Sequence, residues 1–181
     1  AERSAIPVVI GTVGVNLRAS APFASMHRAG LADAARQRWE DAYAKGAALA
    51  QQGNAPAALQ RYEEAAAIDG EYADLAFRMA GCRWAMGEFD AARDLYEQAR
   101  ELDALRFRAD RRINQIIRRV AARASHGRVR LADVEIALRE QSPHGIPGRE
   151  HFYEHVLFRF SGNYVAARAM FEEVRKVLPD H

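Results

Sequence analysis

The chain has 181 residues, of which 49% are hydrophobic and 28% are charged, and its formal net charge is +2. These values are ordinary for a globular domain, and so small a net charge does not by itself indicate a nucleic-acid partner. The single cysteine, Cys82, excludes an internal disulfide and a cysteine-rich metal site, and no run approaches the roughly 18 apolar residues of a membrane-spanning helix.

The start of the chain predicts a strand followed by a long loop, which together make up residues 1–30. The β-branched run from Ile6 to Val13 contains a glycine near its end, and such a run is typical of a buried strand. The residues that follow show no helical or strand periodicity. Because the chain begins at Ala1 without methionine, directly before the strand-like run, we expect it to be a piece of a longer protein.

Two stretches of the chain match each other at a spacing of 34 residues. The matching pairs are Gly53/Gly87, Ala58/Ala92, Tyr62/Tyr96, Ala65/Ala99, Ile68/Leu102 and Asp69/Asp103. A helix–turn–helix unit of this period is typical of the tetratricopeptide repeat, which stacks helices into a scaffold. The chain therefore resembles a tetratricopeptide repeat protein. We predict a mainly α fold, an α–α superhelix with repeats at about 39–72 and 73–106.

A further helix is predicted after the repeats, from about Leu105 to Arg123. Its apolar residues share one face, and they are Ile113, Ile116, Ile117 and Val120. An open end of a repeat stack exposes apolar side chains to water. We therefore expect this helix to cap the stack and to close a helical block that spans residues 31–123.

Arginine is unusually frequent in this helix and just beyond it. The residues are Arg106, Arg108, Arg111, Arg112, Arg118, Arg119, Arg123, Arg128 and Arg130. They form either a basic face for an anion, RNA or an acidic peptide, or a solvated face paired with acids on the repeats. We favour the second interpretation and expect no nucleic-acid partner, because no aromatic side chains are interleaved to stack bases.

Residues 124–181 are predicted to hold a second strand, a loop and a C-terminal helix. The strand covers residues 128–132, and a short helix follows to about Glu140. The segment 142–148 is rich in proline and glycine, which is typical of a loop. The last helix carries an apolar stripe, made up of Ala167, Met170, Phe171, Val174, Val177 and Leu178. The N- and C-terminal segments thus predict a small α/β element into which the repeats are inserted.

The sharpest local pattern is H-x-x-E-H, formed by His151, Glu154 and His155. On a helix this pattern places two histidines one turn apart as zinc ligands, with the glutamate as general base. The context argues against a metal site, because a Pro/Gly loop precedes the pattern and an extended-looking run follows it. We therefore expect no metal and no cofactor; the candidates for metal ligands are His151 and His155, with Glu172 or Glu173 as the third ligand.

Several short motifs of the chain occur together in one enzyme family. They are Pro7-Val8-Val9, Asn16-Leu17-Arg18, Pro22-Phe23, Leu105-Arg106-Phe107-Arg108, His144-Gly145-Ile146-Pro147-Gly148, Phe152-Tyr153-Glu154-His155-Val156-Leu157 and Gly162-Asn163-Tyr164. Through them nearly the whole chain resembles the C-terminal part of SGNH (GDSL-like) hydrolases, more specifically a bacterial subgroup that carries tetratricopeptide repeats. The resemblance implies a bacterial parent, either in the cytoplasm or on the periplasmic side of a membrane anchor.

In this family a D-x-x-H motif supplies the acid and the base of a serine triad. The resemblance places the acid on Glu154 and the histidine on Leu157, a side chain that can accept no proton. His155 lies two residues too early and would have to shift along the chain to serve as the base. The family's serine and oxyanion-hole residues belong to blocks that precede this part of the sequence. We therefore expect that the chain as given is not an enzyme.

The repeat resemblance also gives candidate partner-binding residues, because the first helices of such repeats line a groove. The candidates are Tyr43, Phe77, Arg83 and Trp84. Aromatic side chains anchor a partner when they are exposed, and they are core residues when the stack folds onto another element. We predict a scaffold that binds a peptide or protein partner, with part of an SGNH-type esterase or acyltransferase as the alternative. Apolar faces left by a missing N-terminal half would also promote self-association.

Overall fold

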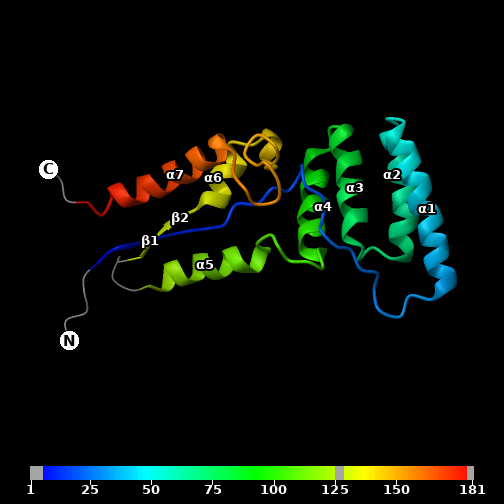
Figure 1. Cartoon of the computed structure of the whole chain (residues 1–181), viewed down its shortest axis with the longest axis horizontal. Helices are drawn as coiled ribbons and strands as arrows, with labels where there is room; N and C mark the ends of the chain where they lie inside the picture. The colour runs from blue at the N-terminus through cyan, green and yellow to red at the C-terminus, as the bar shows by residue number, and fades with distance from the viewer. Residues whose placement is uncertain (1–5, 125–128, 179–181) are drawn as a thin grey trace. The chain divides into compact units, whose positions relative to one another are not determined.

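The computed structural model describes residues 6–124 and 129–178, and the chain divides into two compact units (Figure 1). Unit 1 combines the two ends of the chain, Ala1–Ala19 and Arg108–His181. Unit 2 is the stretch between them, Ser20–Phe107. The helical block is therefore an insertion in unit 1, and it ends about 16 residues earlier than the predicted boundary at 123, because the helix after residue 110 belongs to unit 1.

Unit 2 consists of two helical hairpins (Figure 1). Their helices are α1 (Asp33–Gln51) with α2 (Ala55–Ile68), and α3 (Ala73–Ala85) with α4 (Phe89–Leu102). Each hairpin turns through a glycine with a left-handed backbone, with φ of 76° at Gly53 and 80° at Gly87. Side chains with a Cβ are strained in that conformation, so the repeated glycines set where the helices end.

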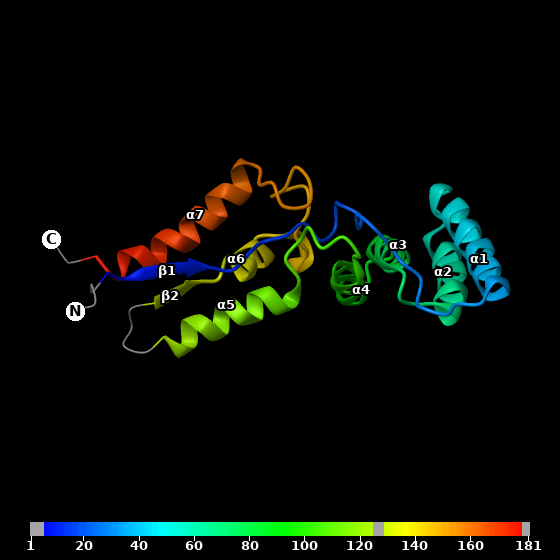
Figure 2. The same cartoon turned by 60° about the horizontal axis from the view of Figure 1, so that its bottom comes forward.

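Small and aromatic residues at matching positions of the two repeats form the core of unit 2. The predicted shared face is buried throughout and comprises Ala58, Tyr62, Ala65, Ala92, Tyr96 and Ala99. In the first hairpin α1 approaches so closely that a Cβ on Gly46 would lie 2.7 Å from the Tyr62 ring. The small residues therefore set the helix spacing, and the tyrosines fill the space between the helices. Figure 2 shows the close pairing of α3 with α4.

The segment before α1 has no helix or strand, as predicted, but it is fixed to the repeats. Two aspartates at equivalent repeat positions hold it. Asp103 accepts a hydrogen bond from the backbone N–H of Phe23 at 3.0 Å. Asp69 lies 2.7 Å from Nδ1 of His27. The repeat period therefore gives this irregular segment two regularly spaced points of attachment.

Unit 1 contains the strands and the remaining helices. In chain order these are β1 (Val8–Gly11), α5 (Arg111–Arg123), β2 (Val129–Ala132), α6 (Val134–Glu140), a short 3-10 helix η2 (Pro143–Gly145) and α7 (Phe160–Arg175). The strands pair in parallel, with Val8 opposite Val129 and Gly11 opposite Ala132. Parallel neighbours need a crossover connection, and the chain that leads from β1 to β2 includes α5. The chain thus has the predicted mainly α fold with a small α/β element.

The strands differ from the predictions in burial and in length. β1 is half-buried rather than buried, and Val8 is 46% exposed. Both strands of this two-stranded sheet are edge strands, so part of each lies next to water. β2 begins at Val129, and the predicted start at Arg128 lies outside the described residues.

Helix α5 corrects the prediction of a cap on the repeats. It begins at Arg111 instead of near residue 105, belongs to unit 1 and packs against β1 and β2. Its buried residue is the polar Asn114, whereas Ile113 is 44% exposed and Val120 is 53% exposed. The apolar face predicted for this helix is therefore not its core face.

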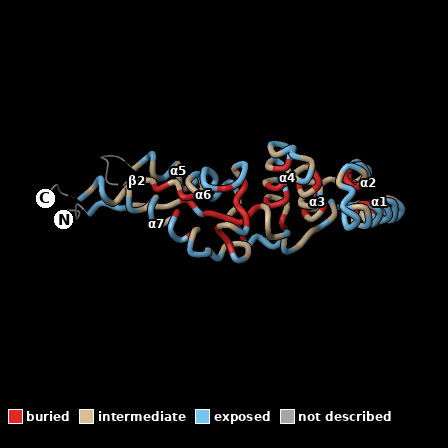
Figure 3. Tube along the Cα trace, turned by 90° about the horizontal axis from the view of Figure 1, so that it is seen from above, coloured by how far each residue is buried: buried red, intermediate tan, exposed pale blue. Residues whose placement is uncertain are grey.

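Helix α7 also buries a different face from the predicted stripe. Gly162 and Val165 are its buried residues, and Phe171 is 58% exposed. Most of the helix is intermediate or exposed (Figure 3). A Cβ on Gly162 would lie 2.4 Å from the carbonyl oxygen of His151. The close approach of the preceding loop to this glycine therefore sets the rotation of the helix.

Candidate functional site

The first helices of the two repeats, α1 and α3, share a polar cluster centred on Asp74. The Tyr43 hydroxyl of α1 donates a hydrogen bond to the Asp74 carboxylate of α3. Arg78, one turn further along α3, donates from Nε to Oδ2 of Asp74 at 2.6 Å. Its guanidinium carbon lies 5.5 Å from the centre of the Tyr43 ring. The three side chains thus join the two repeats through their first helices.

These contacts keep Tyr43 and Arg78 protonated near neutral pH. Burial, and then the hydrogen bond to Asp74, raise the pKa of Tyr43 well above its ordinary value. Burial acts to lower the pKa of Arg78, but the hydrogen bond and charge of Asp74 outweigh it and raise that pKa. Tyr43 therefore remains a hydrogen-bond donor, and the charges of Arg78 and Asp74 balance each other.

A cavity of about 450 Å³ with aromatic walls lies beside this cluster. It is lined by Ser25, Met26, His27, Arg36, Trp39, Glu40, Tyr43 and Tyr72. The Trp39 ring stacks on Tyr43 with a centroid distance of 4.9 Å, and its Nε1 donates to the Asp69 carbonyl oxygen at 2.9 Å. His27 packs edge-on against Trp39 at 4.6 Å. Because neighbours fix these rings, the wall is already formed for an apolar side chain.

One wall of this cavity comes from the irregular segment before α1, and sequence reasoning missed it. Ser25 and His27 lie in the part of the chain that was predicted only as loop. Burial acts to raise the pKa of Asp69, but hydrogen bonds from His27 and from backbone N–H groups outweigh it and lower that pKa. The signal available in the sequence was the repeated aspartate at Asp69 and Asp103, which act as hydrogen-bond acceptors for this segment.

A second cavity, of about 210 Å³, lies between the first hairpin and α3. It is lined by Ala50, Gly53, Ala55, Tyr62, Arg78, Gly81, Cys82 and Ala85. Gly81 leaves it open, since a Cβ there would come no nearer than 3.9 Å to the Tyr96 hydroxyl. Cys82 is buried, and burial raises the pKa of its thiol, which keeps it protonated and unreactive. Arg78 lines this cavity and Tyr43 the first, so the Asp74 cluster connects the two.

The other predicted partner-binding residues make contacts within unit 2. Phe77 packs edge-on against Tyr96, with a centroid distance of 5.3 Å. Trp84 packs in the same way against Phe89 at 5.1 Å. Arg83 forms ion pairs of 2.9 Å and 2.5 Å with one glutamate on α2 and another at the start of α4. The structure therefore brings Tyr43 to a cavity, places Phe77 and Trp84 in contacts within the second repeat, and uses Arg83 to join the second repeat to the first.

The residues predicted for catalysis or metal binding lie in an irregular segment instead of a helix. The Glu154 carboxylate accepts a hydrogen bond from the backbone N–H of Leu157 at 2.6 Å and lies 3.3 Å from Nδ1 of His155. Leu157 itself is 60% exposed. His151 is buried, with Nε2 3.3 Å from the Gln141 carbonyl oxygen. Among the described residues no group of three His, Cys, Asp or Glu side chains could hold a metal ion.

A polar cluster at the carboxyl ends of β1 and β2 also escaped sequence reasoning, although such strand ends often carry sites. Thr12 follows β1 and donates from Oγ1 to Oδ1 of Asp133, which follows β2, at 2.9 Å. Arg118 of α5 pairs with Asp133 at 2.7 Å and with Glu135 at 2.6 Å. Burial acts to raise the pKa of Asp133, but hydrogen bonds from Arg118 and Thr12 lower it overall. Arg118 faces both carboxylates, so the cluster ties α5 to the start of α6, directly after β2.

Residues 49–110 match the tetratricopeptide repeat family. The match begins near the end of α1, covers α2, α3 and α4, and ends directly before α5. The chain therefore carries tetratricopeptide repeats, which typically act as binding scaffolds without catalysis. No curated protein and no solved structure matches the chain significantly. No helix among the described residues is both long enough and apolar enough to cross a membrane.

Proposed function

We propose that the repeats bind an extended segment of a partner protein along α1 and α3. The observation that carries this proposal is the cavity whose walls include Trp39, Tyr43 and Tyr72. Rigid aromatic side chains anchor a partner residue with little loss of conformational entropy. The second cavity, at Gly81, offers a further position for a side chain of the same segment.

The rim of the aromatic cavity favours an uncharged partner side chain. Arg36 and Glu40 line the cavity and pair with each other at 3.0 Å. Met26 lines it as well and is 68% exposed. Because the ion pair and the nearby Asp74 cluster each carry balanced charges, neither attracts a partner of one sign. An apolar side chain flanked by main-chain hydrogen-bonding groups fits this surface best.

The experiment is to select binding peptides from a random phage-displayed library on the full chain and to measure their affinity by fluorescence anisotropy. Glu40→Arg breaks the ion pair at the cavity rim and should weaken a selected peptide about tenfold. Glu64→Arg is the matched control, because it breaks the Arg61–Glu64 pair of 2.8 Å on the surface of α2. Equal affinities of the two variants would rule out this groove as the binding site.

We propose, as the second candidate, that the chain is the C-terminal part of a bacterial SGNH-type esterase or acyltransferase. The 3.3 Å contact between Glu154 and Nδ1 of His155 supports it, since a carboxylate beside an imidazole is how serine triads orient their base. Leu157, at the family's histidine position, weighs against it. The test is hydrolysis of p-nitrophenyl acetate by the full-length parent with and without His155→Ala. A rate that does not change in this variant excludes His155 as the base.

A further inference from the structure

Helix α5 exposes a row of apolar side chains that helices of this composition normally bury. Ile113, Ile116 and Val120 are 44%, 43% and 53% exposed. Their spacing of three and four residues places them in one row along the helix. The side of α5 that packs against the strands instead carries Asn114, which is 1% exposed. Packing within unit 1 does not explain why these apolar side chains are exposed while a polar residue is buried.

Two sets of polar contacts hold α5 in this rotation. The Asn114 side chain accepts a hydrogen bond from the backbone N–H of Val13 at 2.8 Å and donates one to the Val13 carbonyl oxygen at 2.9 Å. Arg118, one turn further along, pairs with Asp133 and Glu135. Rolling the helix to bury the isoleucines would break all of these contacts. The exposure of the apolar row is therefore fixed by the structure of unit 1.

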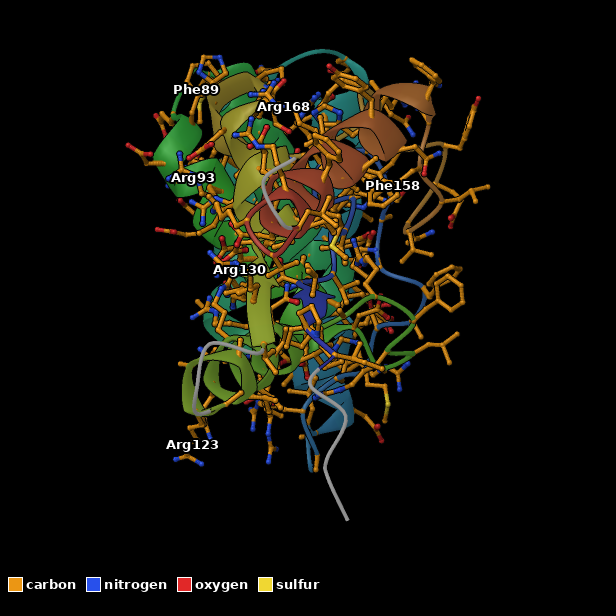
Figure 4. The ribbon with its side chains drawn as sticks, turned by 90° about the vertical axis from the view of Figure 1, so that its left-hand side faces the viewer. Phe89, Arg93, Arg123, Arg130, Phe158 and Arg168 are labelled. Atoms are coloured by element: carbon orange, nitrogen blue, oxygen red, sulfur yellow. The ribbon has the colours of Figure 1, made fainter. Side chains whose placement is uncertain are left out.

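A row of arginines runs beside the apolar row. Arg112, Arg119 and Arg123 are exposed, and none forms an ion pair with another described residue. At 100° per residue they all project to one side of the apolar row, and Figure 4 shows Arg123 extending away from the end of α5. No acidic residue lies in the helix. Positive charge beside exposed apolar side chains complements a surface that is both acidic and apolar.

We propose that this face of α5 binds an acidic amphipathic helix of a partner protein. In a heptad numbering, Ile113, Ile116 and Val120 occupy positions a, d and a, and Arg112 and Arg119 both occupy position g. Residues at a and d pack against a facing helix, and cations at g pair with glutamates of that helix. This surface lies on unit 1, so the proposal is independent of peptide binding by the repeats.

Two other occupants of the same face fit less well. An antiparallel second copy of α5 would bring the two arginine rows together, and a parallel copy would offer Ile117 at position e instead of an acid. Helices that lie on membranes bury large side chains such as Trp, Phe and Leu, and α5 contains none of them. The charge and the residue types of α5 therefore favour an acidic protein helix.

The probe is a synthetic peptide of about three heptads with isoleucine at a, leucine at d and glutamate at every e and g position. Repulsion among its glutamates keeps it from pairing with itself. We expect fluorescence anisotropy with the full chain to show binding that weakens as NaCl rises from about 50 to about 500 mM. Arg112→Gln together with Arg119→Gln should weaken binding by about tenfold or more, and Ile116→Ser should do the same.

The control is Arg139→Gln together with Arg149→Gln, which removes the same charge from other exposed positions of unit 1 and should leave binding unchanged. A peptide of the same composition in scrambled order should not bind, and circular dichroism checks that each variant is folded. Equal weakening by both arginine pairs, equal binding of the scrambled peptide, or no binding at all would overturn the proposal. Co-sedimentation with vesicles of phosphatidylcholine and phosphatidylserine in about a 7:3 ratio, without peptide binding, would overturn it in favour of a membrane surface.

Discussion

Helices α4 and α5 are both amphipathic, yet only α4 buries its apolar face. On α4, Ala92 and Tyr96 are 0% and 4% exposed, whereas on α5 Ile113 is exposed and Asn114 is buried. The neighbours of the two helices differ. α4 packs along α3, which offers apolar side chains, and α5 lies beside a strand end that offers the N–H and C=O groups of Val13. A periodic pattern thus shows which residues share a face, and the neighbour decides which face is buried.

The largest expected effect on stability comes from replacing Asn114, the buried polar residue that holds α5 against the end of β1. Asn114→Leu leaves the N–H and C=O groups of Val13 without their protein partners, which should lower the free energy of unfolding by about 2 kcal/mol. Urea unfolding followed by circular dichroism measures this. Gln115→Leu, at the exposed neighbouring position, should change stability by less than about 0.5 kcal/mol. If the Asn114→Leu variant kept the stability of the unmodified chain, α5 would not owe its rotation to Asn114.

The same contrast separates the features that sequence reasoning found from those it missed. The repeats were predictable because the helices pair locally and the period places Gly53 and Tyr62 in register with their counterparts. The aromatic cavity was not predictable. His27 in its wall lies in a segment without sequence periodicity, and a tertiary contact with Asp69 holds it. The rotation of α5 depends on a contact between residues 101 positions apart, which no local pattern encodes. Side-chain hydrogen bonds to distant parts of the chain are thus what the sequence pattern left out.

Two helical glycines test the packing of the repeats by the same substitution with opposite results. Gly46→Ala places a Cβ 2.7 Å from the ring of the buried Tyr62 and should cost about 1–2 kcal/mol. Gly81→Ala meets only the Tyr96 hydroxyl, at 3.9 Å, and should stabilise α3 by about 0.5–1 kcal/mol, because alanine loses less backbone entropy than glycine. Melting temperatures from calorimetry compare the two variants. Equal melting temperatures would mean that α1 and α2 leave room for a Cβ at Gly46 and are packed less tightly than the 2.7 Å approach to Tyr62 indicates.

Acid should weaken the attachment of the irregular segment to the repeats. The pKa of Asp69 lies below its ordinary value of 3.8, so its contribution to stability is complete above that pH and is lost as the pH falls through the folded-state pKa. Asp69→Asn removes the charge that His27 meets, should cost about 1 kcal/mol near neutral pH, and should reduce the loss of stability on acidification. Thermal melts from about pH 7 to about pH 3 measure both effects. Asp90→Asn, whose side chain is 92% exposed, should keep the acid sensitivity of the unmodified chain.

The smallest effect is expected at Arg83, which was predicted as a partner-binding residue. Its side chain is 30% exposed and pairs with Glu63 and Glu88, whose side chains are 50% and 45% exposed. Exposed ion pairs contribute little, so Arg83→Gln should lower the free energy of unfolding by about 0.5 kcal/mol. A peptide selected on the repeats should bind this variant as it binds the unmodified chain.

Glu40→Arg should show the opposite result, with weaker peptide binding and nearly unchanged stability, because Glu40 lines the aromatic cavity and its ion pair with Arg36 is exposed. Anisotropy and urea unfolding on the same two proteins separate the roles of these positions. If Arg83→Gln lost peptide binding but kept its stability, Arg83 would have to leave its ion pairs with Glu63 and Glu88 and pair with a carboxylate of the partner. The groove would then extend towards α2, beyond the two cavities that join at the Asp74 cluster.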